Sequence, residues 1–330
     1  MQYQTAYPRS GQVALLCEGD LIGYEATLFQ KWAGIFLGNR PLIDIWSCGT
    51  ASAIVGISDA IGRSRPILVI EDRDFRRDVE SVADCAKVRN NREGRGIRVL
   101  DWRSWKRNEV ENYLLEQEVL SPVLCTAFGC SEQDILEALA EILPSLALFQ
   151  AAQYAAGRAR RAWSATDPAP LLLSGLHSRP EWDDQSRRIL PPDDSAFRTA
   201  FEERLVHWIE LPRPDVTDLR SDFQSKYDEW KAVGCENTVW RWDWAGKEVL
   251  QWLRIALTSR FGWLIDRDSG KRETIKWQMN RQQREAQDRP IEAALRPRLI
   301  DRFLRCLPTL SNEIRNEFDE IRTKLETWRD

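Results

Sequence analysis

Three carboxylates follow two short apolar segments that the sequence predicts to be buried strands. Glu18 closes the apolar run 13–17, and Asp72 and Asp74 follow the apolar run 67–70. A charged carboxylate at the end of a buried strand must be paired or must bind a cation, because burying an isolated charge is costly. Residues i and i+2 of a strand point to the same side, so Asp72 and Asp74 would present two oxygen donors with Cα atoms roughly 6 to 7 Å apart. The pattern favours a divalent metal ion.

The elements that must position these acids alternate along the first hundred residues. Short runs of apolar residues predict strands at 13–17, 43–48, 67–70 and 97–100. Apolar residues at helical spacing predict helices at 24–36, 51–61 and about 77–86. This alternation is typical of βαβ units and predicts a mostly parallel sheet with helices on both faces, an α/β fold. In such sheets ligands bind at the carboxyl ends of the strands, where Glu18 can meet Asp72 and Asp74.

The rest of the chain has a different pattern. Segment 132–161 predicts one or two helices, the Pro-, Asp-, Ser- and Arg-rich segment 165–194 predicts a loop with a weak strand at 171–173, and helices resume at residue 197. We therefore expect a catalytic domain at 1–120 and a mainly helical domain at 121–330 for substrate or partner binding. The last helix, 310–328, has one apolar face, which could pack on its own domain or on a second copy in a homodimer.

Trp240, Trp242 and Trp244 alternate with charged residues. As a strand they would form one aromatic face, and such a face more often belongs to a core than to a surface on which nucleobases stack. Both interpretations remain open on the sequence alone.

Composition excludes several classes of protein. The formal net charge is −4, which argues against a uniformly basic nucleic-acid-binding surface. The seven cysteines have no C-x-x-C spacing, so we expect small core residues in a reducing compartment and no zinc site. We found no apolar stretch long enough to span a bilayer and no signal peptide, which predicts a cytoplasmic protein without a membrane partner. No phosphate-binding Gly-x-x-x-x-Gly-Lys-[Ser/Thr] loop is present.

Several motifs together resemble the Toprim nucleases of the OLD type. They occur in the family order: Cys17-Glu18-Gly19, Glu25, Gly49, Ile70-Glu71-Asp72-Arg73-Asp74-Phe75 and Asn108-Glu109-Val110-Glu111-Asn112-Tyr113-Leu114-Leu115. The likeness is greatest to the stand-alone Toprim effector of PARIS-like antiphage systems, and it covers residues 10–120 well and the rest thinly, through Gly246-Lys247-Glu248-Val249-Leu250.

The resemblance implies a nuclease, a toxic effector of abortive infection, that hydrolyses phosphodiester bonds of RNA, including transfer RNA, or of DNA. It implies Mg²⁺ or Mn²⁺ as cofactor and a separate ABC-like ATPase as the controlling partner. The residues that match are Glu18, Asp72 and Asp74 for metal binding and catalysis, Glu25 or Asp20 for completing the metal shell, and Lys247 for neutralising the phosphate. Arg107 and Glu111 could orient a ligand around this site or could simply cap a helix.

Two other classes of function stay open. The chain could be a catalytically silent Toprim scaffold that binds an ATPase partner, and its acids could be a solvated turn and a helix cap. A topoisomerase or primase component is a third alternative, although the helical remainder shows no recognisable strand-passing or polymerase part.

Overall fold

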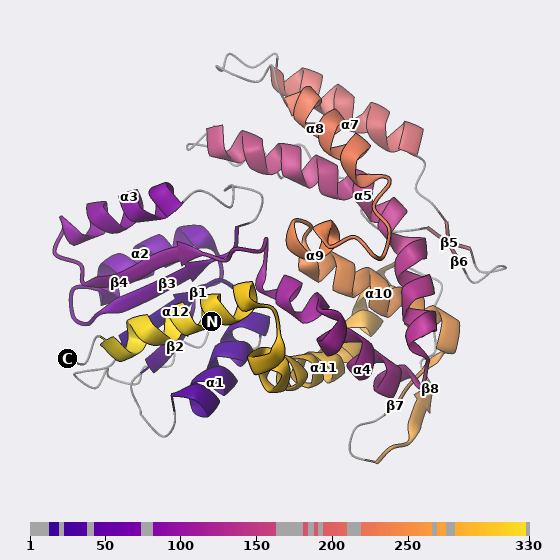
Figure 1. Cartoon of the computed structure of the whole chain (residues 1–330). Helices are drawn as coiled ribbons and strands as arrows, with labels where there is room; N and C mark the ends of the chain where they lie inside the picture. Colours follow the sequence, from indigo (N-terminus) through magenta and orange to yellow (C-terminus); the bar gives the residue numbers. More distant parts are fainter. Residues whose placement is uncertain are drawn as a thin grey trace. The chain divides into compact units, whose positions relative to one another are not determined.

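The computed structural model describes residues 13–19, 23–37, 43–73, 82–162, 181–183, 188–190, 194–209, 219–265, 269–274 and 281–327. The chain divides into two compact units (Figure 1). Unit 1 contains residues 1–72, 79–106 and 300–330, and unit 2 contains residues 73–78 and 107–299. Asp20, Asp74 and the weak strand predicted at 171–173 lie outside the described residues.

Unit 1 is built on a four-stranded parallel sheet. Its strands are β1 (Val13–Cys17), β2 (Ile43–Ser47), β3 (Ile67–Glu71) and β4 (Val99–Ser104), in the order β2-β1-β3-β4. β1 and β3 are buried along their whole length, which explains why both read as uninterrupted apolar runs. The α/β class and the parallel sheet are thus confirmed.

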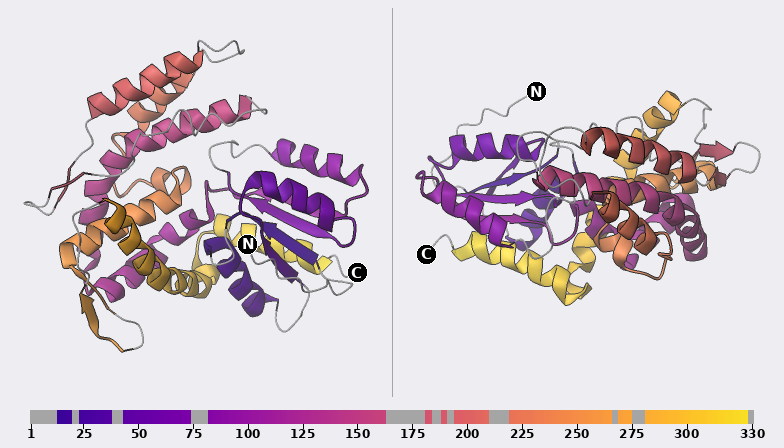
Figure 2. Two further views of the ribbon diagram at one scale, coloured as in Figure 1. Left: turned by 180° about the vertical axis from the view of Figure 1, so that it is seen from behind. Right: turned by 90° about the horizontal axis from the view of Figure 1, so that it is seen from above.

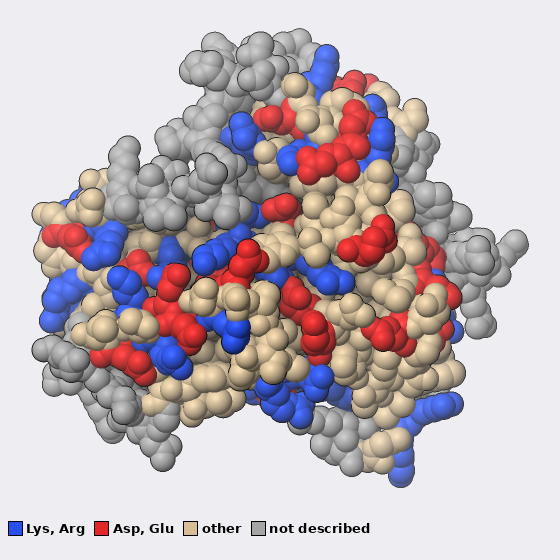
Figure 3. Space-filling model, viewed as in Figure 1, with Lys and Arg blue, Asp and Glu red and all other residues tan. Residues whose placement is uncertain are grey.

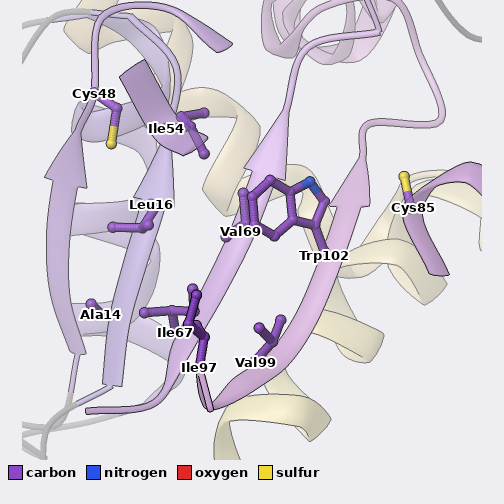
Figure 4. Packing of buried hydrophobic residues seen from close by; sticks show 10 residues of the cluster. All are labelled: Ala14, Leu16, Cys48, Ile54, Ile67, Val69, Cys85, Ile97, Val99 and Trp102. Carbon is purple, nitrogen blue, oxygen red and sulfur yellow. The ribbon is translucent and has the colours of Figure 1, made fainter. Parts of the chain in front are cut away.

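Helices cover both faces of this sheet, as predicted. α1 (Tyr24–Phe36) connects β1 to β2, whereas α2 (Ala51–Ile61) and α3 (Val82–Glu93) make the connections that run the opposite way across the sheet. Because such crossovers are right-handed, α1 lies on one face and α2 and α3 lie on the other (Figures 1 and 2). Alternate strand residues pack against α2 and α3 (Figure 4) in a cluster of Ala14, Leu16, Cys48, Ile54, Ile67, Val69, Cys85, Ile97, Val99 and Trp102.

The face with α1 is aromatic and is completed by the end of the chain. α12 (Asn312–Thr327) buries one apolar face in unit 1 through Ile314, Phe318, Ile321 and Leu325. Phe318 contacts the rings of Trp32, Trp105 and Phe303 at centroid distances of 6.3, 5.7 and 5.3 Å. The predicted amphipathic helix therefore packs on its own unit.

Unit 2 is mainly helical. Its elements are η1 (Val110–Leu115), α4 (Gln117–Phe128), α5 (Glu132–Ala162), the hairpin β5 (Glu181–Asp183) and β6 (Arg188–Leu190), α7 (Asp194–Ile209), α8 (Leu219–Trp230), α9 (Val239–Trp242), α10 (Gly246–Phe261), and the hairpin β7 (Trp263–Ile265) and β8 (Arg272–Thr274). α11 (Arg281–Cys306) begins in unit 2 and ends in unit 1, where η2 (Leu307–Thr309) follows it.

The observed units differ from the expected boundary at residue 120. Residues 107–120 belong to unit 2, and residues 300–330 return to unit 1. The reason is tertiary: η1 packs on α9 and α10, and the apolar face of α12 packs on the sheet unit. Neither contact leaves a local signal in the sequence.

The strand interpretation of the tryptophan segment is wrong. Residues 239–242 form the short helix α9, and Trp244 lies in the bend that follows it, so the three tryptophans do not alternate along a strand. Trp240 and Trp244 are both fully buried, and Trp244 contacts Trp230 at a centroid distance of 5.8 Å. These two rings belong to the core of unit 2, as the commoner interpretation of an aromatic face supposed.

α5 also corrects an expectation. Its residues Glu132–Arg158 are long and apolar enough to cross a membrane by length and composition, because they contain an 18-residue window with a mean hydropathy of 1.5. In the structure 72% of that window is buried, and α5 packs on α8, α10 and α4. Such burial is typical of the core helix of a globular unit.

Charged side chains on the face shown in Figure 3 are mixed. Among the described residues on that face, acidic and basic groups alternate over short distances. This distribution agrees with the near-balanced composition of the chain.

Candidate metal centre

Glu18 and Asp72 lie at the carboxyl ends of two neighbouring parallel strands. Glu18 directly follows β1 and is 8% exposed, while Asp72 directly follows β3 and is half-buried. Cys17 is level with Ile70 in the β1–β3 ladder. In a sheet of order 2-1-3-4 the connections reverse direction between β1 and β3, and ligands bind at this switch point. The structure therefore places both predicted acids where such folds bind ligands.

The loop after Glu18 is fixed by backbone contacts. Gly19 and Gly49 exchange hydrogen bonds, N to O, of 3.1 and 3.0 Å, and the Ser47 hydroxyl donates to the Gly19 carbonyl. Both glycines have positive φ angles, 82° and 80°, which side chains rarely allow. This bridge sets the direction in which the chain leaves β1 and so holds Glu18 at the carboxyl end of the strand.

Glu25 is held by a tryptophan. It lies in the first turn of α1 and is 5% exposed, and Trp105 Nε1 donates to its Oε1 at 2.5 Å. Trp105 is fixed in turn, because its backbone nitrogen donates to Glu71 O at 3.0 Å and its ring stacks on Phe29 at a centroid distance of 5.7 Å. Glu25 is thus a positioned, buried carboxylate.

The Cys17 thiol lies within electrostatic range of three acids. Burial is the main cause that raises its pKa well above the usual value, and the negative charges of Glu25, Asp72 and Glu18 raise it further, as does Cys48. Burial likewise raises the pKa of Cys48 to about 12, with contributions from Glu25 and Glu18. We call Glu18, Glu25 and Asp72 the carboxylate cluster.

The described part of the cluster is not a complete metal site. Among the described residues no group of three or more His, Cys, Asp or Glu side chains is arranged to hold a metal ion. The remaining predicted ligands, Asp74 and Asp20, lie outside the described residues. The donor chemistry nevertheless suits Mg²⁺ or Mn²⁺, which prefer carboxylate oxygen.

Lys247 is found in unit 2, in the first turn of α10. Its Nζ pairs with Glu109 Oε1 at 2.8 Å, and its backbone nitrogen donates to Glu109 Oε2 at 3.0 Å. The Lys247 side chain is 56% exposed. Helix α10 begins against η1, because a Cβ on Gly246 would lie 2.6 Å from the backbone nitrogen of Asn112.

Glu109 belongs to the motif at residues 108–115, but the sequence alone assigned it no role. It is 2% exposed and forms a capping box with Asn112 at the start of η1. The amide of Asn112 also donates to the carbonyls of Arg241 and Trp244, at 3.0 and 2.8 Å. The helix cap expected of Arg107 and Glu111 is thus made by Glu109 and Asn112, three positions apart, a spacing that is visible in the sequence.

Arg107 joins η1 to α9. Its side chain is 1% exposed, lies over the Trp242 ring at 4.2 Å and over the Tyr113 ring at 5.1 Å, and donates to the Asn112 carbonyl at 2.7 Å. It also pairs with Glu116. These contacts give Arg107 a packing role in unit 2.

Glu111 is half-buried beside other acids. Burial is the first cause that raises its pKa from 4.5 to about 7, the charge of Glu109 raises it further, Lys247 lowers it, and Glu292 makes a small raising contribution. Glu109, Glu111 and Lys247 form what we call the lysine cluster.

Scans against protein-family models and searches of curated proteins and of solved structures found no match for this chain.

Proposed function

We propose that this chain carries a divalent-metal-dependent, Toprim-type centre that hydrolyses phosphodiester bonds. Glu18 and Asp72 hold the metal together with Asp74, and Glu25 or Asp20 extends the shell. The observation that supports this most is the position of Glu18 and Asp72 directly after β1 and β3, the two neighbouring parallel strands at the switch point of the sheet.

The proposed metal is Mg²⁺ or Mn²⁺. When bound, such ions would activate water and stabilise the charge that develops on the phosphate. The protein supplies the positions of the ligands: the Gly19–Gly49 bridge orients Glu18, and Trp105 fixes Glu25. Lys247, which pairs with Glu109 in unit 2, stays a prediction for the cation that neutralises the phosphate.

The cellular role that we propose follows from the resemblance of the motifs. The protein is a toxic effector of a bacterial antiphage system acting by abortive infection, its substrate is RNA, including transfer RNA, or DNA, and a separate ABC-like ATPase controls it. A homodimer and a cytoplasmic location remain predictions.

The alternative is a catalytically silent Toprim scaffold that binds an ATPase. One observation favours it: Glu25 already accepts a hydrogen bond from the buried Trp105 and so has a structural role. In that case the other acids of the carboxylate cluster would matter for the fold or for the partner only.

A cleavage assay separates the two functions. The purified chain is incubated with Mg²⁺ and end-labelled RNA or DNA, and Glu18→Gln, Asp72→Asn and Asp74→Asn are compared with Asp59→Asn. Asp59 is an acid of unit 1 that pairs with Arg92 near the end of α2, so it serves as the matched control. Scission by the parent and the control, lost in the other three variants, supports the enzyme. Scission that is absent from the parent, or that is equal in all four variants, supports the scaffold.

A further inference from the structure

Cys125 and Cys130 are brought together where α4 ends. Gly129 adopts the left-handed conformation, with φ 62° and ψ 36°, and its backbone nitrogen donates to the carbonyl of Cys125. The Cys130 backbone nitrogen donates to the same carbonyl at 3.2 Å. This six-to-one hydrogen bond defines a Schellman motif, in which the side chains at the two ends of the bond lie side by side.

The two thiols are close enough to influence each other's pKa. The Cys130 thiol also donates to the Leu124 carbonyl at 3.7 Å. Both residues are half-buried, whereas Cys17, Cys48, Cys85 and Cys306 are buried. Cys125 and Cys130 therefore combine mutual proximity with partial access from solvent, which a disulfide-forming pair requires.

We propose that Cys125 and Cys130 are a redox-active dithiol that closes to an intramolecular disulfide when it is oxidised by a hydroperoxide. One thiolate attacks the peroxide oxygen, which gives a sulfenic acid and releases water or an alcohol. The second thiol attacks the sulfenic sulfur, the S–S bond forms, and a water molecule leaves. In total the two thiols lose two protons and two electrons, and the peroxide is reduced by two electrons to water or an alcohol and a second water molecule. This inference does not depend on the proposed nuclease function.

The pKa values of the two thiols determine which thiol attacks the peroxide first and the rate of that attack. Burial raises the pKa of both thiols, that of Cys130 to about 12, and the nearby acids Glu132 and Asp134 act in the same direction on Cys125. The side-chain interaction with Cys130 lowers the pKa of Cys125, so Cys125 is the attacking thiol. Because little thiolate is present at neutral pH, the reaction is slow and requires sustained oxidation.

Closure would fix the contact between α4 and the β7–β8 hairpin. Trp263 Nε1 donates to the Phe128 carbonyl at 2.9 Å, next to the motif. A Cβ on Gly129 would lie 3.2 Å from the Ile265 side chain, so the turn and β7 pack closely. A disulfide across the motif prevents the last turn of α4 from fraying away from this contact.

The test uses the full chain and three serine variants. The reduced protein is treated with hydrogen peroxide, remaining thiols are alkylated, and peptides are mapped by mass spectrometry for the parent, Cys125→Ser, Cys130→Ser and the control Cys235→Ser. Cys235 is also half-buried and its thiol also donates to a backbone carbonyl, that of Leu136 at 3.3 Å, but no other cysteine is near it in the sequence. We expect a Cys125–Cys130 linkage in the parent and the control, reversal by dithiothreitol, and no linkage in the other two variants.

A second probe does not depend on the oxidation rate. Phenylarsine oxide, which crosslinks two adjacent thiols, should bind the parent and Cys235→Ser and should bind both pair variants at least about tenfold more weakly, as expected when one of two soft ligands is lost. Separate alkylation of Cys125 and Cys130 after full oxidation, together with equal arsenical binding by all four proteins, would overturn the proposal. Circular dichroism of each variant confirms that it is folded.

Discussion

The carboxylate cluster of unit 1 and the lysine cluster of unit 2 contain the same acidic chemistry in different settings. In unit 2, Glu109 caps η1 and accepts from both the backbone and the side chain of Lys247, so its charge fixes a helix junction. In unit 1, Glu18 and Asp72 follow the ends of β1 and β3, and together with Glu25 they raise the pKa of the Cys17 thiol. Glu18 and Glu109 are both buried, so burial does not distinguish the two clusters. The clusters differ in position, because Glu18 and Asp72 follow strands of the sheet whereas Glu109 precedes η1.

This difference separates two roles for a buried acid. An acid that completes backbone hydrogen bonds supports the fold, and its removal should lower stability. Glu18 and Asp72 carry like charges that follow neighbouring strands, and the neutralisation of one of these two should leave the stability of the metal-free protein unchanged or improve it. The predictions below use this contrast, from the largest expected effect to the smallest.

Asp72→Asn should have the largest effect on activity. Loss of a direct metal ligand should lower Mg²⁺-dependent scission at least about 100-fold, the upper range for residues that only support a ligand. The thermal midpoint without Mg²⁺ should not fall, because one of several like charges is removed. Undiminished scission by a folded Asp72→Asn protein would remove Asp72 from the site.

Gly246→Ala tests the junction in unit 2. The new Cβ would meet the backbone of Asn112 and Glu111, which cannot move away as a side chain could, so we expect a loss of about 2 to 3 kcal/mol in the free energy of unfolding. Gly56→Ala is the matched control, because it lies within α2 with open space around it and should stabilise by about 0.5 to 1 kcal/mol. Urea denaturation measures both, and equal changes would contradict the packing of α10 on η1.

Glu111 gives the lysine cluster a pH dependence. Its pKa is 4.5 when unfolded and about 7 when folded, so the folded state binds more protons between these values. Stability should therefore fall as pH rises from about 4.5 to about 7 and then level off, by about 2 kcal/mol after allowance for partial exposure. Glu109, Lys247 and Glu292 are the charged groups that set this pKa. Glu111→Gln should remove this part of the pH profile, and a profile that is the same in the variant would contradict the assignment.

Trp105→Phe removes the indole donor to Glu25 while it keeps an aromatic ring against Phe29 and Phe318. We expect a loss of about 1 kcal/mol, the usual range for a buried hydrogen bond. In the double variant with Glu25→Gln the two effects should not add, since the residues share one interaction. Additive losses would show that the hydrogen bond contributes little.

The sequence predicted the part of the fold that depends on local pattern. Apolar runs and helical spacing located β1, α1, β2, α2 and β3 almost to the residue. They could not show that α12 returns to unit 1 or that Trp240 and Trp244 are buried from a short helix and the bend after it, because both follow from tertiary contacts. For the site, strand ends identified Glu18 and Asp72. The role of Glu109 depends on Lys247, which is distant in the chain, and the proximity of Cys125 and Cys130 depends on the left-handed Gly129.

The most direct test of the central claim is a crystal structure of the protein soaked in Mn²⁺, with anomalous diffraction used to locate the metal. The account predicts an anomalous peak within ligand distance of carboxylate oxygens of Glu18, Asp72 and Asp74, with Glu25 or Asp20 as a further ligand. A well-ordered structure in which Glu18 points away from Asp72, or in which Mn²⁺ binds only elsewhere, would contradict it.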